Sequence, residues 1–156
     1  MIDRTCKCAL ILLIAGISPL GLHRAYAGLG GDYESVVADA ADLHGTESSA
    51  NGPHYTVWKI TADTGMLVRE FLNEDGVVFA VAWTGPVLPD FRHLMGARFA
   101  DYAAALAALR NPGLQRSVRL VSPGLVVEYA GHLRAYAGRA WLPELIPPGV
   151  SSSDLR

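Results

Sequence analysis

The distribution of apolar and polar residues between positions 55 and 83 is typical of short antiparallel strands. Three runs rich in β-branched and aromatic residues follow one another here, and short connections that contain glycine separate them. Such connections favour hairpins. The third run is apolar at odd and even positions alike, as expected for a strand in the interior of a sheet. The predicted meander consists of Tyr55–Thr61, Met66–Leu72 and Val77–Trp83.

Apolar residues at helical spacing occur on either side of this meander. Asp32 can cap a helix whose apolar residues, between positions 33 and 40, share one face. Asp90 can cap a second helix, in which apolar residues from 91 to 109 form one stripe. The tripeptide Asn111-Pro112-Gly113 is expected to end it. The pattern thus predicts one helix before the three strands and one after them.

The remaining segments are a polar stretch and two further strand-like runs. Residues 47–53 are small and polar, with both glycine and proline, and they predict a loop. The runs Ser117–Ser122 and Leu125 to about Trp141 follow the second helix and are joined through a Pro-Gly pair. The second run is long for one strand, so we expect a bend at Gly131 or Gly138.

The predicted order of elements is helix, three strands, helix, two strands. This order does not have the regular alternation of strands and helices that builds parallel sheets. We therefore expect an α+β fold, an antiparallel sheet of about five strands with the helices packed on one face. Residues 28–142 form a single globular domain in this interpretation. Residues 143–156 lose both periodicities, and we expect them to form an extended or disordered tail.

The N-terminal residues follow the three-part order of a secretory signal peptide. Two basic residues precede an apolar run over positions 9–17, and the small residues Ala25 and Ala27 stand where a signal peptidase reads. We expect cleavage between Ala27 and Gly28 and export of the remaining chain. An uncleaved membrane anchor is the alternative, but such an anchor needs about 20 apolar residues. We expect no stable membrane anchor after cleavage.

Removal of residues 1–27 changes the composition of the chain. Cys6 and Cys8 leave with the signal peptide, so the mature chain has no cysteine and its core cannot rely on disulfides. Of 13 basic and 15 acidic side chains, three and one respectively lie in this segment, which leaves a net charge of −4 with neutral histidine. This balance does not favour nucleic acid as a partner.

The last strand-like run carries the candidate site. A period of two places Glu128, His132, Arg134 and Tyr136 on one face of a continuous strand. Arginine presents a rigid fork of donors that suits a carboxylate or phosphate, and the histidine and tyrosine add titratable and aromatic contacts. These four residues therefore predict a face that binds a small anionic ligand or another envelope protein. A solvated strand face is the alternative interpretation.

The other motifs predict no catalytic residue, cofactor or metal site. The triplet Asp63-Thr64-Gly65 has the letters of an aspartic protease loop, but it occurs once and lies in a predicted hairpin turn. No serine stands in a Gly-x-Ser-x-Gly sequence. The histidines of the mature chain do not have the spacing of a metal site; they are His44, His54, His93 and His132.

Several blocks of the sequence resemble one bacterial family. The blocks are Leu29–Gly31, Gly76–Pro86, Pro89–Asp90, Leu94–Gly96 and His132–Ala140. Together they are similar to exported proteins of proteobacteria that are catalogued as domain of unknown function 2844, over about residues 29–150. The resemblance implies a periplasmic or extracellular location in a Gram-negative bacterium. It implies no activity, cofactor or catalytic residue.

These patterns lead to the hypothesis of a small exported domain with a non-enzymatic binding or accessory role. Two alternatives stay open at this point. One is a hydrolase of unidentified substrate that uses His132 with Glu128 or Asp90 as its carboxylate. The other is a purely structural or assembly protein without a ligand.

Overall fold

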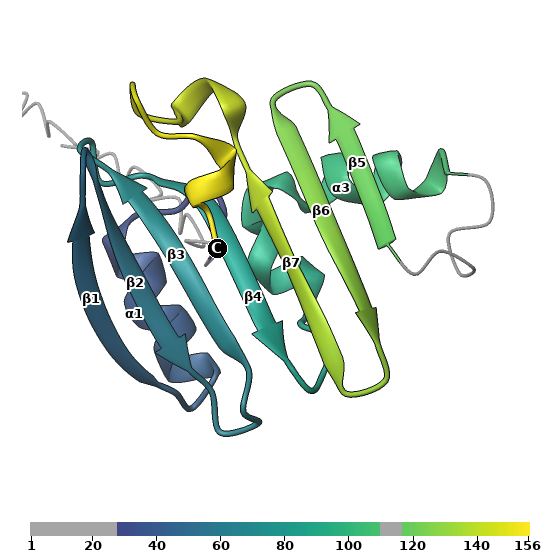
Figure 1. The fold of residues 1–156 in the computed structure, drawn as a ribbon, viewed down its shortest axis with the longest axis horizontal. Helices are drawn as coiled ribbons and strands as arrows, with labels where there is room; N and C mark the ends of the chain where they lie inside the picture. Colours follow the sequence, from purple (N-terminus) through teal and green to yellow (C-terminus); the bar gives the residue numbers. More distant parts are fainter. Residues whose placement is uncertain (1–27, 110–116) are drawn as a thin grey trace, which may run out of the picture.

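The structure, a computed structural model, describes residues 28–109 and 117–156. The predicted signal peptide, with Ala25, Ala27 and both cysteines, lies outside these residues, as does the predicted helix end at 111–113. Within the described residues a seven-stranded sheet forms one layer, and helices cover one of its faces (Figure 1). No helix in this part of the chain is both long enough and apolar enough to cross a bilayer.

Neighbouring strands are antiparallel throughout the sheet, in the order β1-β2-β3-β4-β7-β6-β5. The predicted α+β class with an antiparallel sheet is confirmed, but the sheet has seven strands instead of about five. It consists of two meanders, and β4 pairs with β7 at the seam between them (Figure 1). The strands are β1 (Thr46–Gly52), β2 (Tyr55–Thr61), β3 (Leu67–Asn73), β4 (Val78–Gly85), β5 (Ser117–Ser122), β6 (Leu125–His132) and β7 (Ala135–Trp141).

The helices lie behind the sheet in the view of Figure 1. They are α1 (Tyr33–Asp42), α2 (Phe91–Met95), a 3₁₀ turn (Gly96–Arg98) and α3 (Phe99–Ala107). Both predicted caps are confirmed: Asp32 accepts a hydrogen bond from the backbone N–H of Ser35 at 3.0 Å, and Asp90 accepts one from Arg92 at 2.8 Å. Each cap satisfies an N–H that the first helical turn would otherwise leave without a partner.

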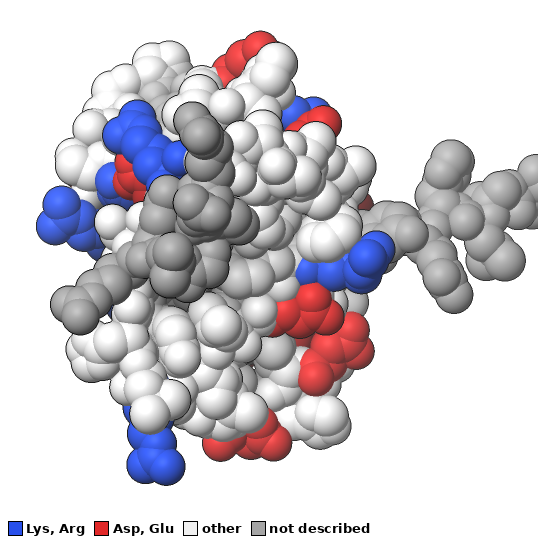
Figure 2. Space-filling model, turned by 90° about the vertical axis from the view of Figure 1, so that its right-hand side faces the viewer, with Lys and Arg blue, Asp and Glu red and all other residues white. Residues whose placement is uncertain are grey.

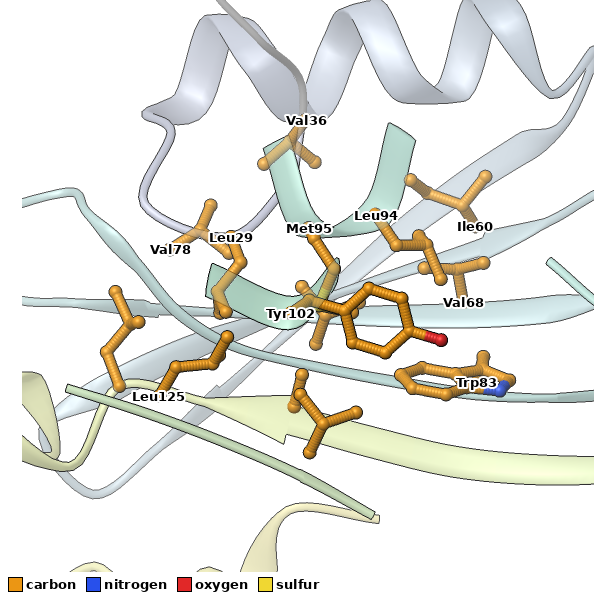
Figure 3. Packing of buried hydrophobic residues seen from close by; sticks show 14 of the residues in the cluster. Leu29, Val36, Ile60, Val68, Val78, Trp83, Leu94, Met95, Tyr102 and Leu125 are labelled. Atoms are coloured by element: carbon orange, nitrogen blue, oxygen red, sulfur yellow. The ribbon is translucent and has the colours of Figure 1, made fainter. Parts of the chain in front are cut away.

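The larger apolar core lies between the helices and the sheet (Figure 3). Val36 of α1, Leu94 of α2 and Val68 of β3 are each at most 2% exposed and meet there. Leu29, which precedes the first helix, is also fully buried in this core, and its N–H donates to the carbonyl of Leu94 at 3.0 Å. The residues directly after the predicted cleavage point are therefore part of the packed structure.

The prediction of a loop over residues 47–53 is wrong, because the chain forms strand β1 there. β1 is an edge strand that pairs with β2 along its whole length, and six of its seven residues are exposed. Ladder hydrogen bonds come from the backbone and need no apolar side chain, so an edge strand that faces water can be polar throughout. The two-residue turn Pro53-His54 connects the strands, and His54 is left-handed with a φ of 64°.

The single bent strand predicted from residue 125 to about 141 is two strands, β6 and β7. The two-residue turn Leu133-Arg134 separates them, and Arg134 adopts a left-handed conformation with a φ of 65°. Such turns usually contain glycine or asparagine, so the sequence gives no signal here. Gly138 lies inside β7, where a Cβ would be only 2.4 Å from Cζ2 of Trp83. The glycine makes room for the indole and does not bend the chain.

Residues 143–156, which we expected to form an extended or disordered tail, form a strap on the sheet face opposite the helices (Figure 1). The strap contains 3₁₀ turns at Pro143–Leu145 and Ser152–Asp154. Leu155 is fully buried and joins a second apolar cluster with Phe71 of β3 and Trp141 of β7. The centre of the sheet is therefore covered on both faces.

Replacing Gly138 by alanine is expected to lower the free energy of unfolding by about 1–3 kcal/mol, because the added methyl group meets the Trp83 indole and Cβ of Tyr129. Urea unfolding followed by tryptophan fluorescence measures the change. Ala137→Ser, at the exposed neighbouring position, is the control and is expected to stay within about 0.5 kcal/mol of wild type. Equal stability of Gly138→Ala and wild type would contradict this packing.

Candidate binding site

A row of mostly basic residues crosses the sheet on the strap side. The strand register places six residues in line, one on each strand from β2 to β5 in the order of the sheet. Neighbouring strands are about 4.8 Å apart, so the side chains of adjacent strands lie next to each other. This basic row consists of Lys59, Arg69, Ala82, Arg139, Glu128 and Arg119.

Glu128 lies between two arginines of the basic row. Arg139 donates to Oε2 of Glu128 through Nε at 3.0 Å and through Nη2 at 2.7 Å, and Nη1 of Arg119 lies 2.9 Å from Oε1. Arg139 also donates to the carbonyl of Ser152 in the strap, and its guanidinium lies over the ring of Trp141. Two guanidinium groups around one carboxylate leave a surplus of one positive charge.

A cavity of about 520 Å³ opens beside the basic row. Small residues form its floor, among them Ala82 of β4, Ala137 of β7 and Ala130 of β6, which leave space above the sheet. Leu155 and Arg156 of the strap line the cavity as well. Its volume lies within the range of sites for small molecules. The hollow is therefore a candidate ligand site with an apolar floor and a basic wall.

Arg69 and Arg139 flank Ala82 across this hollow. Two strand spacings, about 10 Å, separate the backbones of the two arginines, and only a methyl group stands between them. Within residues 28–109 and 117–156, Arg69 makes no ion pair. An oxyanion in the cavity beside Ala82, which is itself 3% exposed, would therefore lie within reach of both side chains. In Figure 2 the basic residues, in blue, gather at the upper left, where acidic residues, in red, are fewer. This side of the molecule is the one that faces the viewer in Figure 1.

Of the four residues that the sequence placed on one face, Glu128 and His132 stay on the same face of β6, whereas Arg134 lies in the turn and Tyr136 on the other face. Glu128 lies in the basic row and lines the cavity. His132 is exposed at the end of β6, Arg134 is exposed in the turn, and Tyr136 is half-buried near the start of β7. The turn reverses the chain, so the period-two alternation does not run through it. Arg139, not Arg134, is therefore the arginine opposite Glu128.

The histidine–carboxylate pairs of the hydrolase alternative do not form. Nδ1 of His132 lies 3.3 Å from the carbonyl of Leu133, and four residues of extended strand, about 13 Å, separate this histidine from Glu128. Asp90 caps α2. In the described part of the chain, no group of three histidine, cysteine, aspartate or glutamate side chains is placed to hold a metal ion.

The sequence pattern pointed to Glu128 but not to the arginines around it. Arg69, Arg119 and Arg139 lie on three strands, and they meet Glu128 or the cavity only through strand register. A signal that could have identified them is that each is the single arginine of its strand, β3, β5 or β7. To use this signal, the position of every turn must be known, because a register shift of one residue moves each side chain to the other face of the sheet.

The chain matches a known protein family. A family model described as Protein of unknown function (DUF2844) matches residues 25–155, which confirms the family assignment made from the sequence. No curated protein and no solved structure matches the chain. The family description names no activity, so the chemistry of the site rests on the geometry above.

Arg139→Ala is expected to lower the free energy of unfolding by about 1–3 kcal/mol, because it removes hydrogen bonds to the Glu128 carboxylate and to the strap. Arg134→Ala is the matched control, and its effect is expected to stay within about 0.5 kcal/mol because Arg134 is exposed. Chemical denaturation of both variants measures the difference. A larger loss for Arg134→Ala than for Arg139→Ala would refute this assignment.

Proposed function

We propose, on the premise that this chain belongs to the DUF2844 family, that it is an exported domain that binds an anionic ligand on the strap side of its sheet. The role is one of binding, or of an accessory to another envelope protein, and not of catalysis. The ligand is a small molecule that carries a carboxylate or phosphate on an apolar body. The observation that carries the proposal is the pair Arg69 and Arg139 on either side of Ala82, above a cavity of about 520 Å³.

The charge around the cavity supports an anionic ligand. Arg119 and Arg139 share one carboxylate, so the three groups together keep one positive charge. Arg69 and Arg156 line the same cavity, and neither forms an ion pair with another described residue. A guanidinium group such as that of Arg69 binds a carboxylate or phosphate through paired hydrogen bonds, which fix both the position and the orientation of the anion, whereas Nε and Nη2 of Arg139 already donate to Glu128.

The floor of the cavity supports an apolar body for this ligand. Ala130 and Ala137 present exposed methyl groups to the cavity. Burial of a ligand's apolar surface here contributes roughly 25 cal/mol per Å². A free inorganic anion would contact the arginines but gain nothing from the floor, so the site favours a molecule with both parts.

The start of the packed chain supports export with cleavage before Gly28. The family match begins at residue 25, close to the predicted cleavage point. Leu29 is fully buried, and its N–H is bound to Leu94 in the core. The packed chain thus extends to within two residues of the expected new N-terminus. The proposed location is the periplasm or the extracellular space of a Gram-negative bacterium.

Thermal-shift measurements with a panel of carboxylates and phosphates on aliphatic or aromatic bodies are expected to identify ligands that stabilise the wild-type domain. At 100 times its Kd a ligand adds about 2.7 kcal/mol to the free energy of unfolding. Arg69→Gln is expected to lose this stabilisation, because it removes one side of the anion site. Ala137→Leu is expected to lose it by filling the floor.

Arg134→Gln removes one positive charge at the exposed β6–β7 turn and is the charge-matched control for Arg69→Gln. It is expected to bind as wild type does. The absence of any saturable stabilisation across the panel, or equal ligand binding by Arg69→Gln and wild type, would reject the proposed function.

Protein recovered from a periplasmic extract is expected to begin at Gly28. The reason is the order of basic residues, apolar run and small residues before this position. Intact-mass measurement checks the cleavage point. Recovery of a chain that retains residues 1–27 in the membrane fraction would contradict export with cleavage. A substitution of Ala27 by a bulky residue is expected to prevent processing and is the matched variant.

A further inference from the structure

Three ionisable side chains meet beneath the helices, away from the proposed binding site. Asp39 of α1 and Glu70 of β3 are fully buried at 0% exposure. His93 of α2 lies beside them, with its Nε2 2.8 Å from Oδ1 of Asp39. Glu70 belongs to the apolar face of β3, in alternation with Val68 and Leu72, and this position in an apolar stripe is the sequence signal of an unusual group. The cluster joins two helices to the sheet.

The contact between Asp39 and Glu70 requires a proton. Two ionised carboxylates are acceptors only, and no donor among the described residues hydrogen-bonds to Glu70. Two negative charges in contact away from water are costly. Burial, together with the contact to Asp39, raises the pKa of Glu70 to about 9. Glu70 therefore keeps its proton at pH 7, and the carboxyl group of Asp39 is the acceptor beside it.

His93 supplies a positive charge to the same cluster. The close contact with Asp39 raises the pKa of His93. Burial opposes this rise, and the negative charges of Asp42 and Asp90 add to it. The His93 side chain is 24% exposed and lines a cavity of about 180 Å³ together with Asp42 and Asp90. It is therefore the member of the cluster that can exchange protons with water.

The charged groups that the structure describes at the cluster come from three elements. Asp39 and Asp42 come from α1, His93 and Asp90 from α2 and its cap, and Glu70 from β3. The residues directly opposite Glu70 on the two neighbouring strands, Trp58 and Val81, do not titrate. Arg69 lines the cavity on the far side of the sheet.

We propose that Asp39, Glu70 and His93 form a proton-binding site that locks α1 and α2 onto the sheet at mildly acidic pH and loosens them as the pH rises. The loaded site holds two protons, one on Glu70 and one on His93. Loss of the His93 proton to water removes the cation beside the buried Asp39. Loss of the Glu70 proton then brings two negative carboxylates into contact.

The direction of the pH dependence follows from the raised pKa of both groups. The folded chain keeps protons that the unfolded chain releases, so the stabilisation is present at low pH. For Glu70 it is complete below its ordinary pKa of 4.5 and declines until about pH 9. For His93 the decline starts near its ordinary pKa of 6.5. The urea midpoint of unfolding is therefore expected to fall between pH 5 and pH 9.

Glu70→Gln tests the proton-binding site directly, because a glutamine amide can donate to Asp39 without a titrating proton. Its urea midpoint is expected to fall less steeply from pH 5 to pH 9 than that of wild type. Calorimetric unfolding at pH 7 in two buffers of different ionisation enthalpy is expected to show that wild type releases about one proton more than Glu70→Gln. Glu144→Gln, at an exposed position of the strap, is the control and is expected to follow wild type.

The same pH profile and the same proton release in Glu70→Gln and wild type would overturn the proposal. If Glu70→Gln does not fold, His93→Gln is the second variant, and it is expected to lose only the part of the decline that begins near the ordinary histidine pKa of 6.5. A His93→Gln profile identical to that of wild type would also overturn it. So would a rise in wild-type Tm with added Zn²⁺ that Glu70→Gln does not show, because the cluster would then be a metal site.

Discussion

Strand β4 is covered on both faces, and the positions of the polar groups in the molecule depend on this double coverage. Val81 and Trp83 meet the helix side, whereas Ala80 and Ala82 belong to the face that carries the strap. A strand in this position has no exposed side on which to place a charge. Charged residues near the centre of the sheet therefore lie on the two strands beside β4. These residues are Arg69 on β3 and Arg139 on β7, with the methyl group of Ala82 between them. The candidate anion site is thus a result of how the centre of the sheet is built.

Parts of the fold that depend on local chemistry could be predicted from the sequence. The helix caps Asp32 and Asp90 and the buried strand near Val77–Trp83 follow from residues that are close together in the chain. The edge strand β1 and the turn at Arg134 could not be predicted. β1 is held by backbone hydrogen bonds to β2 and has a polar sequence, while Arg134 takes a left-handed φ for which its side chain gives no signal.

The candidate site was only partly accessible from the sequence, for the same reason. Glu128 could be selected as a polar residue in a β-rich run, but its partner Arg139 depends on the register of a hairpin whose turn was not recognised. The buried acids present a different difficulty. Glu70 is a single charged residue in an apolar stripe, and its protonation depends on Asp39, which reaches it only after α1 has packed on the sheet. Such pairs form only in the tertiary structure, so neither hydrophobic periodicity nor secondary-structure propensity predicts them from the sequence.

The seam between β4 and β7 also determines the order in which the sheet can assemble. Every other ladder joins strands that follow one another along the chain, so each meander can begin to form from local contacts. The ladder at the seam can form only when residues 135–141 are available, because these residues form β7, the partner strand of β4. Until then the most apolar strand of the protein has one unpaired edge. During this interval a folding chain is most prone to associate with other chains.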